Sequence, residues 1–482
     1  MKKIFLNNIA IIDSSFNRNL FIDLASILVK KHNSKLDVYC LNKYSASVYS
    51  KKGILFNSVN IIPLSVSKKY EKFSDKDVFR QSLVYERKFN KTYAWYSATN
   101  RILGRGFSPT APNFPRFSNK KISLEYIAYY YNNLIKFWEN EFITKKTKLL
   151  LCPGLIESNI GRKFGIINRS FNSSRYKSFY CWYTDEFWDN AMIQKQFEVT
   201  KYKKEISIKL ESMPNWNSSQ MREILKHSKL NYLLKRIYKK VIKHIYWIYF
   251  KKNDRNYNLF SEINYIIRSF FNTRFITGSE LYNLNYLNEK KFIFFPLQVE
   301  PERNLQGNSP EFFNQHAALI DLSINLPSDT YLVVKEHLPS AGVRSKVFYN
   351  QLLRDYSNIV FVNAKIKGID LIERSHAVAT INGTAGLEAS IIGKPVISFS
   401  KHNPYNFLPH VYIINDRKKI KDTLFKIFNN RISTDKSVKD GQRYLEALKK
   451  ISIDLPEFTT LNTKFSEQNV KKCYQILMDT LI

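Results

Sequence analysis

The stretch HAVATINGTAGLEASIIGKPVIS, residues 376–398, constrains the fold of this chain more than any other segment. Residues 377–381 form an apolar, β-branched run, and residues 387–392 predict a short apolar helix that Gly393 ends. A loop with two glycines separates them, and a second apolar run begins at Pro395. Strand, glycine loop, helix and strand in this order predict a parallel α/β sheet.

The glycine loop of this segment predicts a binding site for a phosphate, and therefore an enzyme that uses a nucleotide-linked donor. In a parallel sheet the loop lies at the carboxyl ends of the strands, where ligands bind, and the helix dipole and free N–H groups favour an anion. A carboxylate in the first helical turn can reach a ribose hydroxyl. The alternative is that these residues only cap the helix and complement its dipole. The donor-binding candidates are Asn382, Gly383, Thr384, Gly386 and Glu388.

A second set of polar residues ends the predicted strand 331–335. Strand alternation puts Lys335 and His337 on one face of the strand and Glu336 on the other. A lysine and a histidine aimed at the same site suit a diphosphate or a sugar-nucleotide monophosphate, and a protonated His337 would stabilise the leaving phosphate. The alternative is a histidine that caps a neighbouring carbonyl.

The loop after the predicted strand 292–295 carries three charges in the sequence FPLQVEPER. It follows the first strand of the second predicted α/β region, so it ends at the same edge of the sheet as the glycine loop. Glu300, Glu302 and Arg303 are therefore candidates for contacts with a donor or an acceptor. An exposed charged loop without a ligand is the alternative.

Three segments, FFPLQVEPER, VVKEHLPSAGVRSKVFY and ATINGTAGLEASIIGKPVI, occur in this order within residues 290–410. Together they resemble the bacterial capsule polysaccharide biosynthesis family, which includes transferases that use CMP-Kdo, a CMP-linked 3-deoxy-octulosonic acid. The resemblance implies a GT-B fold, a CMP-activated acidic sugar as donor, and a growing glycan or glycolipid of a capsule or lipopolysaccharide as acceptor. It also implies that a Lys-x-His-Pro element, here Lys335 and His337, binds the donor together with the Gly-Thr loop. In this chain Leu338 stands between His337 and the proline.

The length of 482 residues and the 44% of hydrophobic residues predict two domains, each with its own core. Strand and helix patterns alternate at the N-terminus and again after Lys291. Together with the resemblance, this order predicts an α/β fold of the GT-B class, with two Rossmann-like domains, a helical connector and a C-terminal crossing helix. The expected bounds are an acceptor domain over 1–195 with an irregular insertion over 42–120, a basic connector over 196–285, a donor domain over 286–455 and a C-terminal helix over 456–482.

The acceptor side of such an enzyme needs a base, because an inverting transferase removes the proton of the acceptor hydroxyl. The candidates are strand-end carboxylates of the first domain, namely Glu157, Asp185 and Glu186. Glu157 follows the predicted strand 148–152, and the pattern predicts that a helix begins at Arg162. Each carboxylate could instead be a solvated loop residue, and a retaining mechanism needs a nucleophile in place of the base.

The chain has 75 Lys and Arg against 41 Asp and Glu, a formal net charge of +34. Nucleic acid, an anionic membrane and an acidic polymer are the partners that such a charge suits, although part of it reflects a composition rich in Lys and Asn. The segment 229–252 predicts an amphipathic helix whose lysines lie mostly off the apolar stripe. This helix either lies on an anionic membrane or packs its stripe on the domains with its lysines in water. The stripe consists of Leu230, Leu234, Ile237, Val241, Ile245 and Ile248.

Other features bound the compartment and the cofactors. No run of 18 uncharged apolar residues is present, so no transmembrane helix is predicted. Four well-separated cysteines without a CxxC pair indicate a reducing compartment and no zinc site. We therefore expect a cytoplasmic protein, peripheral at most on the inner face of the plasma membrane, that needs no metal and no cofactor beyond the nucleotide sugar it uses as substrate.

Four other functions stay open. A polyol-phosphate transferase of the teichoic acid type also releases CMP, and a UDP- or GDP-sugar transferase would use the same loop for another nucleotide. A basic nucleic-acid-binding protein fits the charge, but the chain shows no recognition motif and no basic face interleaved with stacking aromatics. The last is a scaffold that has lost its activity, and Leu338 is the residue that favours it.

Overall fold

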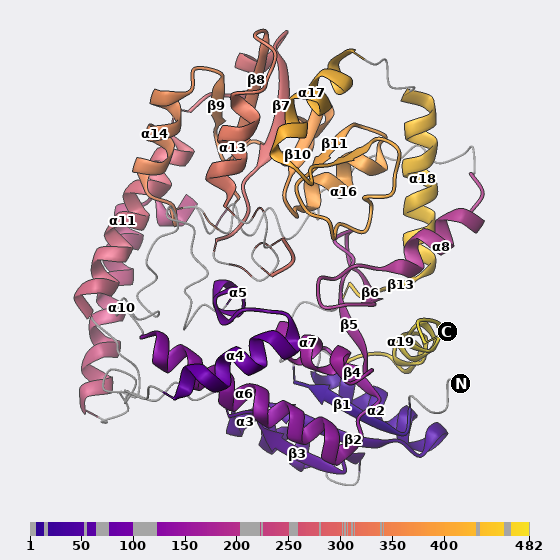
Figure 1. The fold of residues 1–482 in the computed structure, drawn as a ribbon. Coiled ribbons are helices and arrows are strands. Elements are labelled where there is room, and N and C mark those ends of the chain that lie inside the picture. Colours follow the sequence, from indigo (N-terminus) through magenta and orange to yellow (C-terminus); the bar gives the residue numbers. More distant parts are fainter. Residues whose placement is uncertain are drawn as a thin grey trace. The chain divides into compact units, whose positions relative to one another are not determined.

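The chain forms two compact units in the computed structural model (Figure 1). Unit 1 is made of Met1–Ser97, Lys121–Lys201 and Arg443–Ile482, and unit 2 of Ala98–Lys120 and Tyr202–Gln442. The last part of the chain therefore belongs with the N-terminal unit. The structure describes residues 6–13, 18–52, 55–63, 77–99, 123–202, 222, 225–249, 259–278, 281–300, 302, 305, 307–309, 312, 314–337, 340, 342–429, 434–456 and 464–481.

Unit 1 is built on a seven-stranded sheet in the order β13-β6-β5-β4-β1-β2-β3. The strands from β5 to β3 run parallel, and their order is that of a Rossmann sheet. The strands β6 and β13 are antiparallel additions at one edge. The bounds are β1 Asn8–Ile12, β2 Lys35–Cys40, β3 Ser58–Ile61, β4 Leu149–Leu151, β5 Ile167–Ser173, β6 Phe179–Tyr183 and β13 Ser452–Asp454.

The sequence predicts an irregular insertion over 42–120, but the described part of this region holds α3, β3, α4 and α5. In α4 the buried residues Val78, Tyr85 and Phe89 recur at helical spacing. Because the residues between them are mostly polar, the segment as a whole is polar and does not stand out as a helix with one apolar face. The helices of unit 1 are α2 Arg18–His32, α3 Lys43–Ser50, α4 Val78–Phe89, α5 Tyr93–Thr99, α6 Leu124–Lys145, α7 Leu155–Lys163, α8 Ala191–Val199 and α19 Glu467–Asp479.

The helix after β4 begins earlier than predicted. The helix α7 starts at Leu155, and β5 follows where the sequence predicts a helix from Arg162. Cys152 has a φ of 55°, a left-handed conformation that turns the chain sharply after the strand. Gly154 is the N-cap of α7, so Glu157 lies in its first turn.

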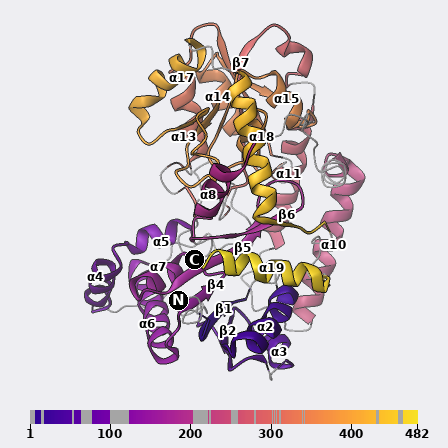
Figure 2. The ribbon, with the colours of Figure 1, turned by 90° about the vertical axis from the view of Figure 1, so that its right-hand side faces the viewer.

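The C-terminal segment completes the core of unit 1 (Figure 2). The strand β13 pairs with β6, and α19 packs beside α2. The indole Nε1 of Trp182 donates a hydrogen bond of 3.0 Å to the carbonyl of Cys473. Arg169 donates to the hydroxyl of Thr480 at 2.8 Å, and burial lowers the pKa of Arg169 to about 10. The predicted C-terminal helix is therefore present, and it is part of the first unit.

We expect Leu477→Ala to lower the free energy of unfolding of unit 1 by about 2–5 kcal/mol, because it deletes a fully buried side chain of α19 and leaves a cavity. Urea titration followed by tryptophan fluorescence measures the change. Lys472→Ala on the exposed face of the same helix is the matched control, with an expected change below about 0.5 kcal/mol. Equal midpoints for the two variants would show that α19 is not part of the core.

Unit 2 is built on a six-stranded parallel sheet in the order β12-β11-β10-β7-β8-β9. Counted along the chain from β7, the order is 6-5-4-1-2-3, that of a doubly wound Rossmann sheet. The prediction of an α/β fold with two Rossmann-like domains is confirmed. The order reverses between β7 and β10, and such sheets bind ligands at the carboxyl ends of the strands at this point. The bounds are β7 Lys291–Pro296, β8 Thr330–Lys335, β9 Ile359–Val362, β10 Ala377–Thr380, β11 Val396–Ser398 and β12 Val411–Ile413.

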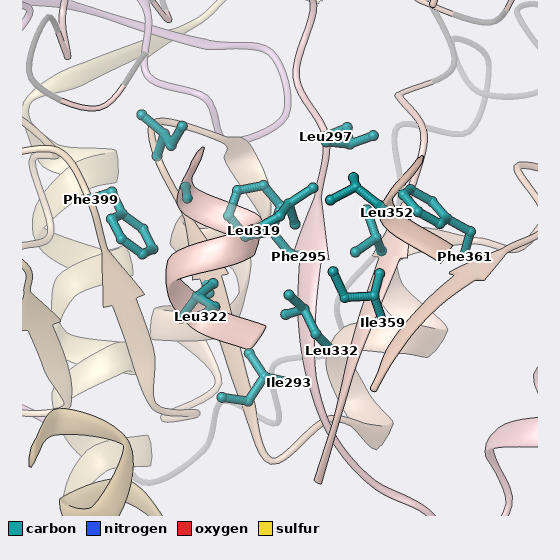
Figure 3. Close-up of a cluster of buried hydrophobic side chains, with 14 of the residues drawn as sticks. Ile293, Phe295, Leu297, Leu319, Leu322, Leu332, Leu352, Ile359, Phe361 and Phe399 are labelled. Carbon is teal, nitrogen blue, oxygen red and sulfur yellow. The ribbon is translucent and has the colours of Figure 1, made fainter. Parts of the chain in front are cut away.

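The central strands of unit 2 are buried on both faces, which explains why they read as continuous apolar runs. Figure 3 shows Leu319 and Leu322 of α13 beside Phe295 of β7, and Leu352 of α14 close to Phe361 of β9. This core fixes the strand ends that carry the candidate site. The helices are α10 Leu230–Tyr249, α11 Leu259–Thr277, α13 Gln315–Ser323, α14 Lys346–Asp355, α15 Gly368–Arg374, α16 Thr384–Ile391 and α17 Ile420–Asn429, with 3₁₀-helices at Leu284–Leu287 and Arg417–Lys419. The helix α18 Thr434–Lys450 begins in unit 2 and continues into unit 1.

Candidate active site

Three loops of unit 2 meet at the carboxyl ends of β7, β8 and β10. The backbone N–H of Leu297, after β7, donates to the carbonyl of Lys335 at the end of β8, at 2.9 Å. The backbone N–H of Asn382, after β10, donates to Oε1 of Gln298 at 3.2 Å. The structure therefore brings together the three segments that the sequence singles out.

A second glutamine holds Gln298 in place. The backbone N–H of Gln298 donates to Oε1 of Gln315 at 2.6 Å, and its carbonyl accepts from Nε2 of Gln315 at 3.1 Å. Gln315 is buried and is the first residue of α13, so the start of this helix fixes the loop after β7. Sequence reasoning missed both glutamines, because neither is charged and neither belongs to a glycine motif.

Arg344, only 1% exposed, is the centre of a buried ion cluster. Its guanidinium pairs with Glu336 at 2.7 Å and with Glu300 at 3.4 Å. It also donates to the carbonyl of Gln298 at 2.7 Å, and the Tyr349 hydroxyl donates to the other oxygen of Glu336. Burial opposes the charge of Arg344, yet the two carboxylates raise its pKa above the ordinary value. The cluster ties the loop after β7 to the end of β8.

The described charged residues of the loop after β7 are less exposed than the charges of this loop suggest. Glu300 is 2% exposed and faces its arginine partner. Glu302 is half-buried. Arg303 lies outside the described residues, as do Leu338 and Pro339. The roles predicted for the three charged residues of this loop stay predictions.

Lys335 and His337 lie in different environments. Lys335 is buried, its Nζ donates to the carbonyl of Glu336 at 3.3 Å, and burial lowers its pKa to about 8. His337 is exposed, and its backbone N–H donates to the Glu336 carboxylate at 2.8 Å. Desolvation by neighbouring groups, and then the charges of Lys335 and Arg344, lower the pKa of His337 to about 4. At neutral pH the cation at this strand end is therefore Lys335, and the imidazole of His337 is neutral. A bound anion beside His337 would favour its protonated form.

The glycine loop is shorter than predicted. The helix α16 begins at Thr384 with Gly383 as its N-cap, three residues before the predicted start. The N–H of Gly383 donates to Oγ1 of Thr380 at 2.9 Å. The N–H groups of Thr384 and Ala385 belong to the first turn, whose donors have no partner within the helix, so they are placed to bind an anion.

Gly386 allows a close approach within the core. A Cβ atom at this position would lie 2.3 Å from the hydroxyl oxygen of Tyr405 and 2.6 Å from Cγ2 of Thr380. Only a residue without a side chain lets α16 pack against these groups. Packing therefore accounts for this glycine, and its predicted contact with the donor stays a prediction.

Glu388 lies in the second turn of α16 and is half-buried, where the sequence predicts the first turn. Desolvation raises its pKa to about 7. At neutral pH the carboxyl is therefore partly protonated, and it can donate as well as accept a hydrogen bond. This property suits contact with a hydroxyl group.

We expect Glu388→Gln to stabilise unit 2 at pH 8 by about 1–3 kcal/mol and to change little at pH 5. The pKa of the folded state is raised, so the wild type is most stable below the ordinary value of 4.5 and loses stability as the pH rises through about 7. The neutral glutamine does not titrate and escapes this loss. Thermal unfolding at both pH values measures the difference, and Glu373→Gln on the exposed surface of α15 is the matched control. A stabilisation that is equal at both pH values would contradict the raised pKa.

In unit 1, two of the three base candidates lie near one tyrosine. Glu157 folds back over the start of α7, because a Cβ on Gly154 would lie 2.4 Å from its Oε2. Burial raises the pKa of Tyr96, and the charges of Glu157 and Glu186 add to the effect. The Tyr96 hydroxyl donates to Oδ1 of Asn159 at 2.5 Å. The two carboxylates therefore lie near the carboxyl end of β4.

The three base candidates differ in what holds them. Glu186 is buried and paired with Arg162. Asp185 accepts backbone hydrogen bonds from Phe187 at 3.0 Å and Asp189 at 2.8 Å, so it shapes the turn after β6. Glu157 is half-buried in the first turn of α7. Of the three, only Glu157 lies at the helix start that follows a parallel strand of the sheet.

An ion pair that sequence reasoning missed stands at the end of β1. Asp13 accepts from Arg18 at 2.9 Å and from the Tyr49 hydroxyl at 3.2 Å. Arg18 also donates to Oγ of Ser45 at 2.6 Å. The order of the unit 1 sheet reverses between β1 and β4, so this pair occupies the carboxyl edge at the reversal. The signal was an aspartate directly after an apolar strand, with an arginine five residues later.

Known proteins share the segment that carries these loops. Residues 201–406 match the family described as capsule polysaccharide biosynthesis protein. This part of the chain is similar to that family. The resemblance read from the sequence is confirmed, and the match extends from the loops of unit 2 to α10 and α11.

A curated relative and several solved structures are also similar. Protein FixF of Sinorhizobium fredii (strain NBRC 101917 / NGR234) is 28% identical over 136 residues, 28% of this chain and about a third, 32%, of the relative. The β-Kdo 2,7 transferase KpsC of Thermosulfurimonas dismutans is 16% identical, covers 71% of this chain and 89% of its own, and has a TM-score of 0.34. A glycosyltransferase from Rickettsia africae ESF-5 is 10% identical, covers 98% of both chains, and has a TM-score of 0.34. Similarity at this level does not identify a substrate.

Proposed function

We propose that the protein is a glycosyltransferase of bacterial surface polysaccharide synthesis whose unit 2 binds a nucleotide-sugar donor. The observation that carries the proposal is the meeting of three loops at the reversal point of the unit 2 sheet, two of which carry groups suited to a nucleotide. The start of α16 offers N–H groups, the end of β8 offers Lys335 and His337, and α16 offers Glu388. This combination suits a phosphate next to a hydroxyl-bearing ribose. The family match over the same segment supports it.

The donor is a CMP-activated ulosonic acid such as Kdo. A CMP-linked sugar has a single phosphate, and one helix start with one buried lysine supplies charge for a single phosphate. Thr384 and Ala385 donate from the backbone to its oxygens, and Lys335 neutralises its charge. An anion bound beside His337 favours its protonated form, against the desolvation and the two neighbouring cations that lower its pKa. Glu388 binds a ribose hydroxyl.

The acceptor is a glycan or a lipid-linked glycan, and unit 1 supplies the base. Glu157 takes the proton of the acceptor hydroxyl as that oxygen bonds to the anomeric carbon of the sugar. The bond from this carbon to the phosphate oxygen breaks, and CMP leaves with the electron pair. The charge that develops on the phosphate is stabilised by the α16 N–H groups and by Lys335. This route inverts the anomeric configuration.

The cytoplasm is the proposed compartment. None of the four cysteines, all of which the structure describes, forms a disulfide, and Cys40, Cys181 and Cys473 are buried. Nucleotide sugars are cytoplasmic substrates of such transferases, and cysteines without disulfides suit a reducing compartment.

We expect CMP to raise the melting temperature more than CDP, UDP or GDP in a thermal-shift panel, because a ligand that binds only the native state stabilises it. Lys335→Met and Glu388→Ala remove a phosphate contact and a ribose contact, so both should lose most of the CMP shift. His376→Ala, at the amino end of β10, and Glu373→Ala, on the exposed surface of α15, are the matched controls and should keep it. No shift with any of the four nucleotides would refute the donor site, and a larger shift with UDP or GDP would reassign the nucleotide.

We expect Glu157→Gln to lower the release of CMP from a CMP-linked ulosonic acid by about 10²–10⁴-fold while CMP still binds, because the variant keeps the shape of the base but cannot accept a proton. Coupled detection of CMP with a glycan acceptor measures the rate. Asp185→Asn, which alters only a turn-forming carboxylate, is the matched control and should stay within about tenfold. Turnover that is unchanged in Glu157→Gln would remove Glu157 as base. CMP binding without release by the wild type, over a panel of acceptors, would favour the scaffold.

A further inference from the structure

The helix α10 exposes a continuous apolar strip. Its strip residues recur every three or four positions along the helix, so they share one face, and each is 47–66% exposed. No membrane-spanning helix is found among the residues that the structure describes, so this strip is not part of a spanning segment. The strip consists of Leu230, Leu234, Tyr238, Ile242 and Ile245.

The rest of α10 is accounted for by its neighbour in unit 2. The helix α11 packs beside α10 (Figure 1). Lys240 pairs with Glu262 of α11 at 2.8 Å, and this glutamate is buried. Ile237 and Val241, which the sequence assigned to the same stripe as Leu230, are half-buried. The predicted single stripe is therefore split, and three of its members, at positions 230, 234 and 245, are exposed. The side chain of its last member, Ile248, lies outside the described residues.

The charge of the two helices is of one sign. The sequence of α10 contains no Asp or Glu, and α11 contains Glu262 alone, which is paired. Lys235 and Lys239 are exposed next to the strip, and Lys229 is exposed just before the helix begins. At 100° per residue, positions 235 and 239 fall directly beside the apolar sector. An exposed apolar strip bordered by lysines, with no exposed acid on either helix, is complementary to an anionic surface that has an apolar interior.

We propose that α10 lies in the plane of an anionic phospholipid bilayer, with the strip residues in the headgroup and upper acyl region. Lys229, Lys235 and Lys239 then lie level with the lipid phosphates, and Tyr238 has an apolar ring and a polar hydroxyl that suit this depth. The helix holds unit 2 at the membrane surface through residues that are separate from the loops of the candidate site. The inference does not depend on the proposed donor or reaction.

An anionic bilayer is the partner that suits both the apolar strip and the lysines beside it. A second copy of this chain would place like charges together, because the exposed part of the segment is basic throughout. An acidic protein would match the lysines, but it would need an extended apolar ridge as well to cover a strip that runs along most of the helix. A bilayer offers the charge and the apolar region at once.

Co-sedimentation with vesicles tests the proposal on the full-length protein. At about 150 mM salt we expect binding to vesicles of phosphatidylglycerol and phosphatidylethanolamine, and at least tenfold weaker binding to phosphatidylcholine vesicles. The variant Leu234→Ser/Ile245→Ser keeps every charge and should lose at least tenfold of the affinity for anionic vesicles. The variant Lys229→Glu/Lys235→Glu/Lys239→Glu should lose as much. Because all five positions are exposed, neither variant should change the melting temperature by more than a few degrees.

A matched triple charge reversal separates this surface from the general positive charge of the chain. Lys418→Glu/Lys419→Glu/Lys421→Glu changes the net charge equally at exposed positions before and within α17, and it should keep vesicle binding. Equal loss in both triple variants, with no loss in Leu234→Ser/Ile245→Ser, would overturn the proposal in favour of non-specific attraction. Light scattering provides a second check: a dimer that the serine variant dissociates, without vesicle binding by the wild type, would identify the strip as a self-association surface and also overturn it.

Discussion

The buried pairing of Arg344 with Glu336 and Glu300 is the interaction on which the geometry of unit 2 depends most. Each of these side chains is almost inaccessible to water, so each charge is stable only because the others are present. The same arginine holds the carbonyl of Gln298, whose side chain accepts from the backbone of Asn382. Loss of one partner would leave an unpaired charge in the interior, at a cost of about 3–5 kcal/mol. The loops that are proposed to bind the donor therefore share one electrostatic support.

Much of the fold could be predicted from the sequence, because the strands of unit 2 are buried on both faces. Such strands appear as short apolar runs, and β8 agrees with its predicted range 331–335 to within one residue. The irregular appearance of residues 42–120 was misleading, because α4 and its neighbours bury only a narrow face. The pairing of β13 with β6 could not be foreseen either. A strand of three residues has no periodicity, and its partner lies far away in the sequence.

The candidate site shows a similar division. The sequence indicates the three segments that meet, because strand ends and glycine turns have local patterns. It does not indicate which charged residues face inward, because Glu300 and Arg344 occur in loops, where no periodic pattern marks the buried side. Gly386 shows what a sequence motif cannot distinguish. The glycine is required, but the reason is its close packing against Tyr405 and Thr380. For α10 the sequence shows that the helix is amphipathic. It does not show which side α11 covers, because the pattern of one helix contains no information about its packing partner.

The division of the chain between the two units has a consequence for the order of folding during synthesis. Unit 2 consists of the continuous segment Tyr202–Gln442 and the short segment Ala98–Lys120. Unit 1, in contrast, includes β13 and α19, which follow unit 2 in the sequence. Until β13 and α19 have left the ribosome, the edge strand β6 and the apolar side of α2 lack these partners. Unit 2 can therefore reach its native state while unit 1 is still incomplete. A chaperone that binds exposed strand edges would therefore act on unit 1, which is synthesised first, after unit 2 has already folded.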